Sequence, residues 1–411
     1  MATPEASWRG GLAAEVSTAQ DLPLGVARPH LRGLQGVNLV SSLDRATIAP
    51  MLLVIAADLR VSVAEVTLVA SVYYLTYGLM QPVWGIVAAR VGTVRTLRLT
   101  LVGAGVVGLA SALAPDVVAL TVLRSIAGGL FAAAIPSTLV YVGTRVPVER
   151  RQQPLADLMA GVAVGMAAGT LGAGWAADLV SWRWAFAATA AAGVVLAVLL
   201  RTLPELPREP GAARPVRALV SAVRRPWTAL VLGLAFVEGM ALTGVLTFIA
   251  PGVQESIAGG AGLAGSVVAA YGISVLLFTR VVGPLSGRLA TPTLLVVGGT
   301  AGVGGFGVLA VHRGLAGGLV ACVLLGAAWA FMHSTLQTWA TSVAPEARAQ
   351  VVPLFAACLF LGGSTGAAVS AGPAGDGRYA LLFGVTAVVL VPLTVVAALA
   401  RRRYLRTRPG R

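Results

Sequence analysis

Charged side chains inside otherwise apolar stretches are the residues of this sequence that could do chemistry. Asp44 and Arg45 lie in one such stretch, Arg124 in a second and Glu238 in a third. A charge at the centre of a bilayer costs about 2.5 to 3.5 kcal/mol on insertion scales, so each must face a partner or an interior cavity. A guanidinium beside a carboxylate favours the ionised acid, and its withdrawal lets a proton bind. The pattern predicts a proton or cation carrier, with structural ion pairs as the alternative.

The stretches that hold these charges are long enough to cross a membrane. The 411 residues are 57% hydrophobic and 11% charged, and the mean hydropathy is +0.85. A hydrocarbon core about 30 Å thick needs about 20 helical residues. The sequence therefore predicts an all-α membrane protein with twelve transmembrane helices. These spans are expected near residues 35–57, 67–89, 97–114, 117–142, 154–177, 184–203, 227–250, 264–287, 292–311, 315–342, 350–372 and 379–400.

An internal repeat divides the twelve spans into two halves of six. The sequence Ser-Thr-Leu at 137–139 returns at 334–336, and Gly-x-x-x-Gly at 165–169 returns at 362–366. Repeats in the same orientation indicate two equivalent helical bundles with the functional site between them. We therefore predict two pseudo-symmetric six-helix bundles.

The composition along the chain sets the expected domain boundaries. We predict a cytoplasmic tail at 1–34, a first bundle at 35–203, a linker at 204–226, a second bundle at 227–400 and a basic tail at 401–411. The linker is expected where proline and arginine cluster without an apolar run.

The basic residues indicate the topology of the chain. All thirty are arginine, and the net charge is +14. Most fall in the tails and in alternate loops, which places both termini in the cytoplasm by the positive-inside rule. We therefore expect a multi-pass protein of a bacterial-type cell membrane, in contact with the lipid bilayer and not with nucleic acid. The loops predicted to lie outside keep only Arg60, Arg183, Arg313 and Arg378.

The loop after the second span carries a recognisable motif. Residues 85–95 resemble the G-x-x-x-D-R-x-G-R-R loop of the major facilitator superfamily. The acid of that motif helps to clasp the cytoplasmic side of the two halves in the family, but Ala89 stands in its place here. The resemblance implies the twelve-span fold of this family and a gating role for the matching residues. These are Gly85, Arg90, Gly92 and Arg95.

Two more elements resemble the same family. Arg124 begins an R-x-x-x-G element that is implicated in proton transfer in proton-driven members, which implies a coupling role with Asp44. A rise of 1.5 Å per residue places the two side chains within a few Å of the same depth. The fifth span resembles the G-x-x-x-G-P-x-x-G-G element of antiporters, although Thr170 replaces the proline. Glycines at such spacing also let helices pack closely. The glycines of this stripe are Gly161, Gly165, Gly169 and Gly172.

The second half offers further candidate residues. Glu238 lies near the midplane and is a candidate for binding a proton or a cation, with a hydrogen-bonded packing acid as the alternative. Arg280 could bind an anion, but we favour its pairing with Glu238. His333 could titrate near neutrality or simply pack. The remaining candidates for a substrate cavity are Arg45, Tyr73, Tyr77 and Trp329.

No arrangement of residues in the sequence indicates an enzyme. Cys322 and Cys358 fall within spans, which disfavours a structural disulfide and a metal site. The resemblance implies a secondary transporter of the twelve-span drug/proton antiporter group. We expect a monomer that exports a small amphipathic compound in exchange for a proton on Asp44, driven by the proton gradient without a cofactor. The alternatives are an uptake symporter or uniporter for a polar metabolite, and a membrane sensor or scaffold that does not transport.

Overall fold

The computed structural model describes residue 26, residues 28–206 and residues 223–407. All long regular elements in these ranges are helices. Eleven helices are long and apolar enough to cross a membrane, and a pair bent by 41° brings the number to twelve. The twelve-helix prediction is therefore confirmed for length and composition. Most of the predicted tail at 1–34 and of the linker at 204–226 lies outside the described residues.

The first bundle contains six spans, of which the first and the fourth are broken. The first span consists of α2 and α3, and the fourth consists of α6 and α7. In chain order the helices are α2 (Arg28–Ala46), α3 (Ile48–Leu59), α4 (Val63–Val91), α5 (Thr93–Ala112), α6 (Val117–Phe131), α7 (Ala134–Arg145), α8 (Gln152–Leu179) and α9 (Trp182–Leu199).

The second bundle repeats this plan, but its breaks are π-helical turns. The turns η3 (Met240–Gly244) and η5 (Trp329–His333) interrupt its first and fourth spans. A π turn inside a longer helix is often found at a functional site. The other elements are α11 (Pro226–Gly239), η4 (Val245–Phe248), α12 (Ile249–Ile257), α13 (Ala261–Ser286), α14 (Thr291–Val311), α15 (Leu315–Ala328), α16 (Ser334–Val343), η6 (Pro345–Ala347), α17 (Arg348–Gly375) and α18 (Tyr379–Arg406).

Glycine contacts fix the register between the two halves. In the first bundle, a Cβ on Gly165 would collide with the carbonyl oxygen of Leu39, because α8 lies directly against α2. In the second bundle, a Cβ on Gly362 would collide with the carbonyl oxygen of Phe236 in the same way. Both members of the second pair lie 197 residues after their counterparts. In this register Glu238 occupies the position in the second half that is equivalent to Ser41 in the first. The position equivalent to Asp44 holds no acid.

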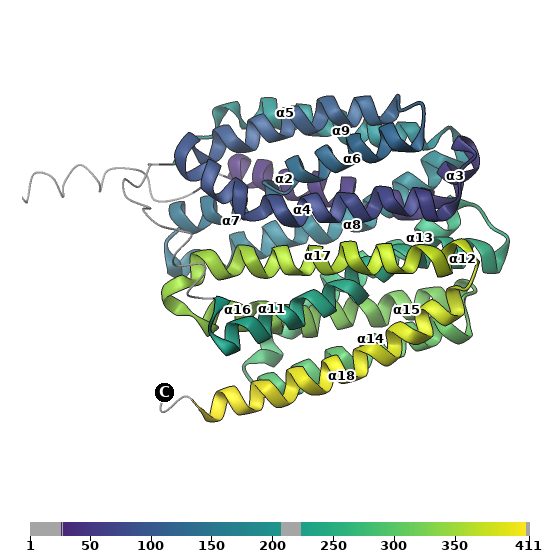
Figure 1. Cartoon of the computed structure of the whole chain (residues 1–411). Coiled ribbons are helices and arrows are strands. Elements are labelled where there is room, and N and C mark those ends of the chain that lie inside the picture. The colour runs from purple at the N-terminus through teal and green to yellow at the C-terminus, as the bar shows by residue number, and fades with distance from the viewer. Residues whose placement is uncertain (1–25, 27, 207–222, 408–411) are drawn as a thin grey trace, which may run out of the picture.

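The two bundles lie side by side and meet along α4 with α17 and along α8 with α13 (Figure 1). We call the end where α4, α7 and α18 finish the arginine-rich end, and the other the opposite end. Between the bundles, Ser71 bonds to Ser364, and a Cβ on Gly375 would lie 3.6 Å from that of Ala64. These contacts lie toward the opposite end.

Near the arginine-rich end, fewer atoms of other elements lie close to these helices. A Cβ added to Gly85 on α4 or to Gly283 on α13 would meet no atom of another element within 4 Å. The bundles therefore close together at one end and diverge toward the other.

Candidate functional site

The site is built around Asp44, which lies at the break in the first span. The hydroxyl of Thr47 donates to the main-chain carbonyl of Asp44 at 2.7 Å, so a side chain supplements the long main-chain bond of 3.4 Å from the nitrogen of Thr47 at the break. The bend between α2 and α3 follows at once. Asp44 is only 1% exposed, so its carboxylate must find its partners within the bundle.

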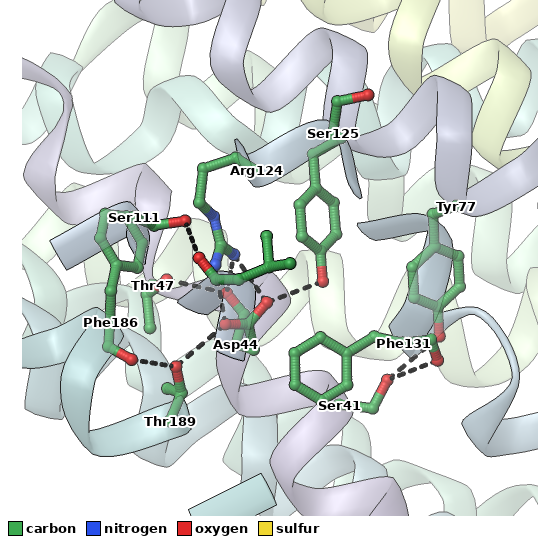
Figure 2. A network of polar contacts seen from close by, with 12 residues as sticks. Ser41, Asp44, Thr47, Tyr77, Ser111, Arg124, Ser125, Phe131, Phe186 and Thr189 are labelled. Atoms are coloured by element: carbon green, nitrogen blue, oxygen red, sulfur yellow. Dashed lines mark hydrogen bonds and ion pairs between the residues drawn. The ribbon is translucent and has the colours of Figure 1, made fainter. Parts of the chain in front are cut away.

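Four donors from three other helices surround the carboxylate of Asp44 (Figure 2). Arg124 binds it with both terminal nitrogens: Nη1 lies 3.0 Å from Oδ1, and Nη2 lies 2.6 Å from Oδ2. Tyr73 donates its hydroxyl to Oδ2 at 2.9 Å, and Thr189 donates to Oδ1 at 3.0 Å. Four donors with two oxygens stabilise the ionised acid, so the cluster holds a buried charge pair.

Arg124 is held between two aromatic rings. Its guanidinium carbon lies 5.0 Å from the ring centre of Tyr73 and 4.5 Å from that of Phe186. Gly128, one turn further along α6, has no side chain to collide with the main chain of Tyr73. The R-x-x-x-G element thus has a physical meaning here: the glycine lets α6 approach α4, and the arginine reaches Asp44.

The sequence singled out Asp44, Arg124 and Tyr73, and the structure brings these three together. It did not single out Thr189 or Phe186. Thr189 is one threonine in an alanine-rich helix, and threonines are common in such helices. The only available signal was the repeat, because Phe186 and Phe383 lie 197 residues apart.

Arg45 points away from this cluster. Its guanidinium carbon lies 5.5 Å from the ring centre of Tyr77 and 5.2 Å from that of Phe360 on the second bundle. Tyr77 also hydrogen-bonds with Ser41 at 3.3 Å. Arg45 is partly buried and has no ion pair among the described residues. It therefore places a positive charge at the interface between the bundles.

In the second bundle, Glu238 faces His333 and not Arg280. Glu238 is 0% exposed, and its Oε2 lies 3.2 Å from Nδ1 of His333. The ring of His333 stacks on Trp329, with 4.0 Å between the ring centres. The predicted pairing of Arg280 with Glu238 is wrong, because Arg280 lies on an exposed part of α13 toward the arginine-rich end.

The loop between α4 and α5, which carries the family motif, is hydrogen-bonded to a carboxylate from outside the motif. Glu205 accepts hydrogen bonds from the main-chain nitrogens of Val94 and Arg95, at 2.8 and 3.0 Å. Gly92 has a φ of +115°, which favours glycine, and a Cβ there would also collide with Glu205. Arg90 and Arg95 are exposed. In place of an acid at Ala89, an acid from beyond α9 therefore caps α5.

The glycine stripe of α8 packs against α2 along most of its length. A Cβ on Gly161, Gly165 or Gly169 would collide with main-chain atoms of α2. Gly172 differs, because no atom of another element lies within 4 Å of such a Cβ. The close packing predicted for Gly172 is therefore not found in this structure.

Comparisons with known proteins agree with this architecture. The sequence model of the Major Facilitator Superfamily matches residues 36–367. The colistin resistance protein EmrB of Acinetobacter baumannii is 27% identical over 42% of this chain and 33% of its own length. The multi-drug resistance efflux pump PmrA of Streptococcus pneumoniae is 26% identical over 63% of this chain and 67% of its own. The chain thus spans about a third of the first relative and two thirds of the second.

Among solved structures, the fold is similar to that of a mutant of the nucleoside transporter NupG. The TM-score is 0.75 with 15% sequence identity, and the similarity covers 90% of this chain and 99% of that one. At this level of identity the likeness concerns the fold alone.

Proposed function

Because the chain belongs to the Major Facilitator Superfamily, we propose that it is a proton-coupled exporter of a small amphipathic compound. The observation that carries the proposal is the buried pair of Asp44 and Arg124, in which every carboxylate oxygen has two donors. Such a pair is costly to bury for structural reasons alone. The names of EmrB and PmrA, a resistance protein and an efflux pump, support export as the direction.

The proposed mechanism is an exchange of partners on Asp44. In the structure Arg124 neutralises the carboxylate, and no proton is needed for charge balance. If α6 moves relative to α2, Arg124 withdraws, and the remaining buried carboxylate binds a proton in its place. Tyr73 and Thr189 stay within reach as hydroxyl partners of either form. The protonation state is thereby linked to the arrangement of the helices.

The arrangement of the bundles supports alternating access. They touch at the opposite end and diverge toward the arginine-rich end. By the positive-inside rule the arginine-rich end is cytoplasmic, which makes this an inward-facing state with both described ends of the chain in the cytoplasm. Rocking of one bundle against the other would close this side and open the other. The membrane is then the cell membrane of a bacterium, and one chain contains both bundles.

Replacement of Asp44 by asparagine tests the proposed carrier. In inverted membrane vesicles, we expect Asp44→Asn to abolish uptake of fluorescent amphipathic compounds driven by the proton gradient, because an amide cannot exchange a proton. Glu149→Gln, at the exposed loop before α8, is the matched control and should transport normally. Full gradient-driven transport by Asp44→Asn at equal protein levels would show that Asp44 is not the carrier.

A second candidate function is uptake of an anionic metabolite. Arg45 and Arg280 favour it, since both lack an ion-pair partner among the described residues and lie toward the space between the bundles or its arginine-rich end. An importer takes up substrate and protons together, so the medium of de-energised cells would become alkaline when substrate is added outside. Without a proton gradient, an exporter that exchanges protons runs backwards, with substrate entering as protons leave, and the medium would become acidic.

A further inference from the structure

Glu238 is a buried acid that takes no part in the exchange of partners proposed for Asp44 and Arg124. Its side chain is 0% exposed, and its only ion-pair partner among the described residues is His333. Its second oxygen, Oε1, is buried and has no hydrogen-bond partner there. An ionised carboxylate with one bare oxygen is poorly stabilised in an apolar interior. This position is therefore suited to an acid that gains and loses a proton.

His333 connects Glu238 to the space outside the packed core. Its side chain is 12% exposed, while that of Glu238 is sealed. The imidazole stacks on the ring of Trp329, and the ring centre of Phe355, on α17, is 5.7 Å from that of the imidazole. These rings fix the plane of the imidazole, so Nδ1 stays on Glu238 and the exposed edge can meet water. An imidazole in this position can relay a proton.

Both residues lie beside the π-helical turns. Glu238 is two residues before η3, and His333 is the last residue of η5. Such turns are irregular points at which a helix can change its arrangement. The first bundle has Ser41 at the position equivalent to Glu238, so this pair is not a copy of the Asp44 cluster.

Few charged or titratable groups lie around Glu238, and His333 is the one that contacts it among the described residues. On α13, the hydroxyl of Tyr271 is buried without a partner among the described residues and lies within electrostatic reach of both Glu238 and Arg45. On α17, the described side chains offer the thiol of Cys358, and α16 has no titratable residue. The arginines of α18 lie in its last turns, near the arginine-rich end.

We propose that Glu238 and His333 form a second proton-binding site, separate from Asp44. A hydronium ion gives a proton to Nε2 of His333 and leaves water, and Nδ1 gives its proton to Oε2 of Glu238. One O–H bond of the hydronium ion and the Nδ1–H bond break while one N–H and one O–H bond form, so the pair gains one proton and leaves a neutral imidazole. The loaded pair has no net charge, and the unloaded pair carries one negative charge.

The use of this proton in transport rests on the proposed function. If the protein is a proton-coupled exporter, it has one proton site in each bundle and can carry two protons in a cycle. The binding itself is a property of the chain without substrate, and it can be measured separately.

Infrared difference spectroscopy of the purified, substrate-free protein tests the site. As the pH is lowered, we expect a carbonyl stretching band of a protonated carboxylic acid that is lost in Glu238→Gln and retained in Glu149→Gln. In His333→Gln the band should persist, but at a changed frequency and a changed pH of appearance, because the hydrogen-bond partner is different. A merely structural role for His333 would not move either quantity.

Two outcomes would overturn the inference. One is a set of pH-difference spectra that is the same for the parent and Glu238→Gln, which would mean that Glu238 keeps one protonation state. The other is an unchanged band in His333→Gln, which would separate the histidine from the site. Neither depends on Asp44: the spectrum of Asp44→Asn should still contain the band of Glu238, whereas failure of the proposed function appears as proton-driven transport by Asp44→Asn.

Discussion

Asp178 should act as a latch that holds the two bundles together at the opposite end. It lies at the end of α8 in the first bundle and accepts hydrogen bonds from the first two main-chain nitrogens of α13 in the second. Oδ1 lies 2.9 Å from the nitrogen of Ala261, and Oδ2 lies 2.7 Å from that of Gly262. A negative charge at a helix N-terminus is stabilised by the free N–H groups and by the helix dipole. Opening of this end must break both bonds.

The size of the effect follows from these contacts. Asp178→Asn keeps one acceptor oxygen but loses the other, together with the charge. A hydrogen bond to a charged group contributes about 1.5 to 3 kcal/mol, and the lower end applies because the side chain is exposed to water. We therefore expect a loss of about 1 to 2 kcal/mol from the closed state, which raises the ratio of open to closed molecules by about 5- to 30-fold.

Disulfide crosslinking at the same end measures this ratio. In the structure a Cβ on Gly375 would lie 3.6 Å from the Cβ of Ala64, which is within the usual range for a disulfide. With Cys322 and Cys358 replaced by alanine, the pair Ala64→Cys and Gly375→Cys should crosslink rapidly under mild oxidation. Addition of Asp178→Asn lowers the closed fraction and should slow this reaction, by at most the factor given above, which is reached when the open state predominates.

The matched control is Asp157→Asn, which lies on the same helix near the arginine-rich end. Asp157 accepts a hydrogen bond from Gln153 within α8 and has no hydrogen bond or ion pair to the described part of the second bundle. It should leave the crosslinking rate unchanged. Equal rates for the parent and Asp178→Asn would refute the latch, because they would show that the two bonds to α13 do not stabilise the closed end.

Two further predictions concern stability in detergent, measured as the thermal unfolding midpoint. Glu205→Ala removes the cap of α5 and should cost about 0.5 to 2 kcal/mol, whereas the exposed Glu149→Ala should cost little; equal midpoints would contradict a capping role. Gly165→Ala forces a methyl group against the carbonyl oxygen of Leu39 and should cost about 1 to 3 kcal/mol. Gly172→Ala meets no neighbour and should be neutral or stabilising by up to about 1 kcal/mol; a reversed order would show that α8 does not pack as described.

The fold could be predicted from the sequence because a bilayer allows few solutions. Backbone groups without water must bond within their own segment, so each apolar run of sufficient length becomes a helix. The repeat then fixed two bundles, since Gly165 and Gly362 occupy equivalent places. The family expectation, taken from the loop, arginine and glycine elements, is confirmed by the match over residues 36–367.

The partners of the charges were harder to predict, because they depend on the rotation of each helix about its axis. Asp44 and Arg124 were close in depth and met, but depth alone also allowed Arg280 to reach Glu238. The structure gives that place to His333 because η5 carries it toward α11. A π turn changes the angle between successive side chains, and the sequence of Trp329–His333 gives no sign of it.

The same limit explains the glycines. The spacing of glycines shows that a helix has a face of small residues, but it does not show where the neighbouring helix on that face ends. Gly165 lies where α2 crosses α8, while Gly172 lies beyond that crossing. For Gly85 the outcome depends on the conformation, since α4 is separated from the second bundle at this point. A residue that closes the arginine-rich end in another state would have no neighbour in this one.

The two buried acids show how the halves of a repeat can take different tasks. The positions equivalent to Asp44 and Arg124 in the second bundle hold apolar or weakly polar residues, whereas Tyr73 has a counterpart in Tyr271, 198 residues later. With no carboxylate to receive its hydroxyl, Tyr271 is left without a partner among the described residues. The first bundle thus holds its acid with a guanidinium, which is always charged, and the second with an imidazole, which is not. In the mechanism that we propose, withdrawal of Arg124 depends on movement of a helix, whereas loading of Glu238 requires only a proton on His333, so the two sites would respond to different signals.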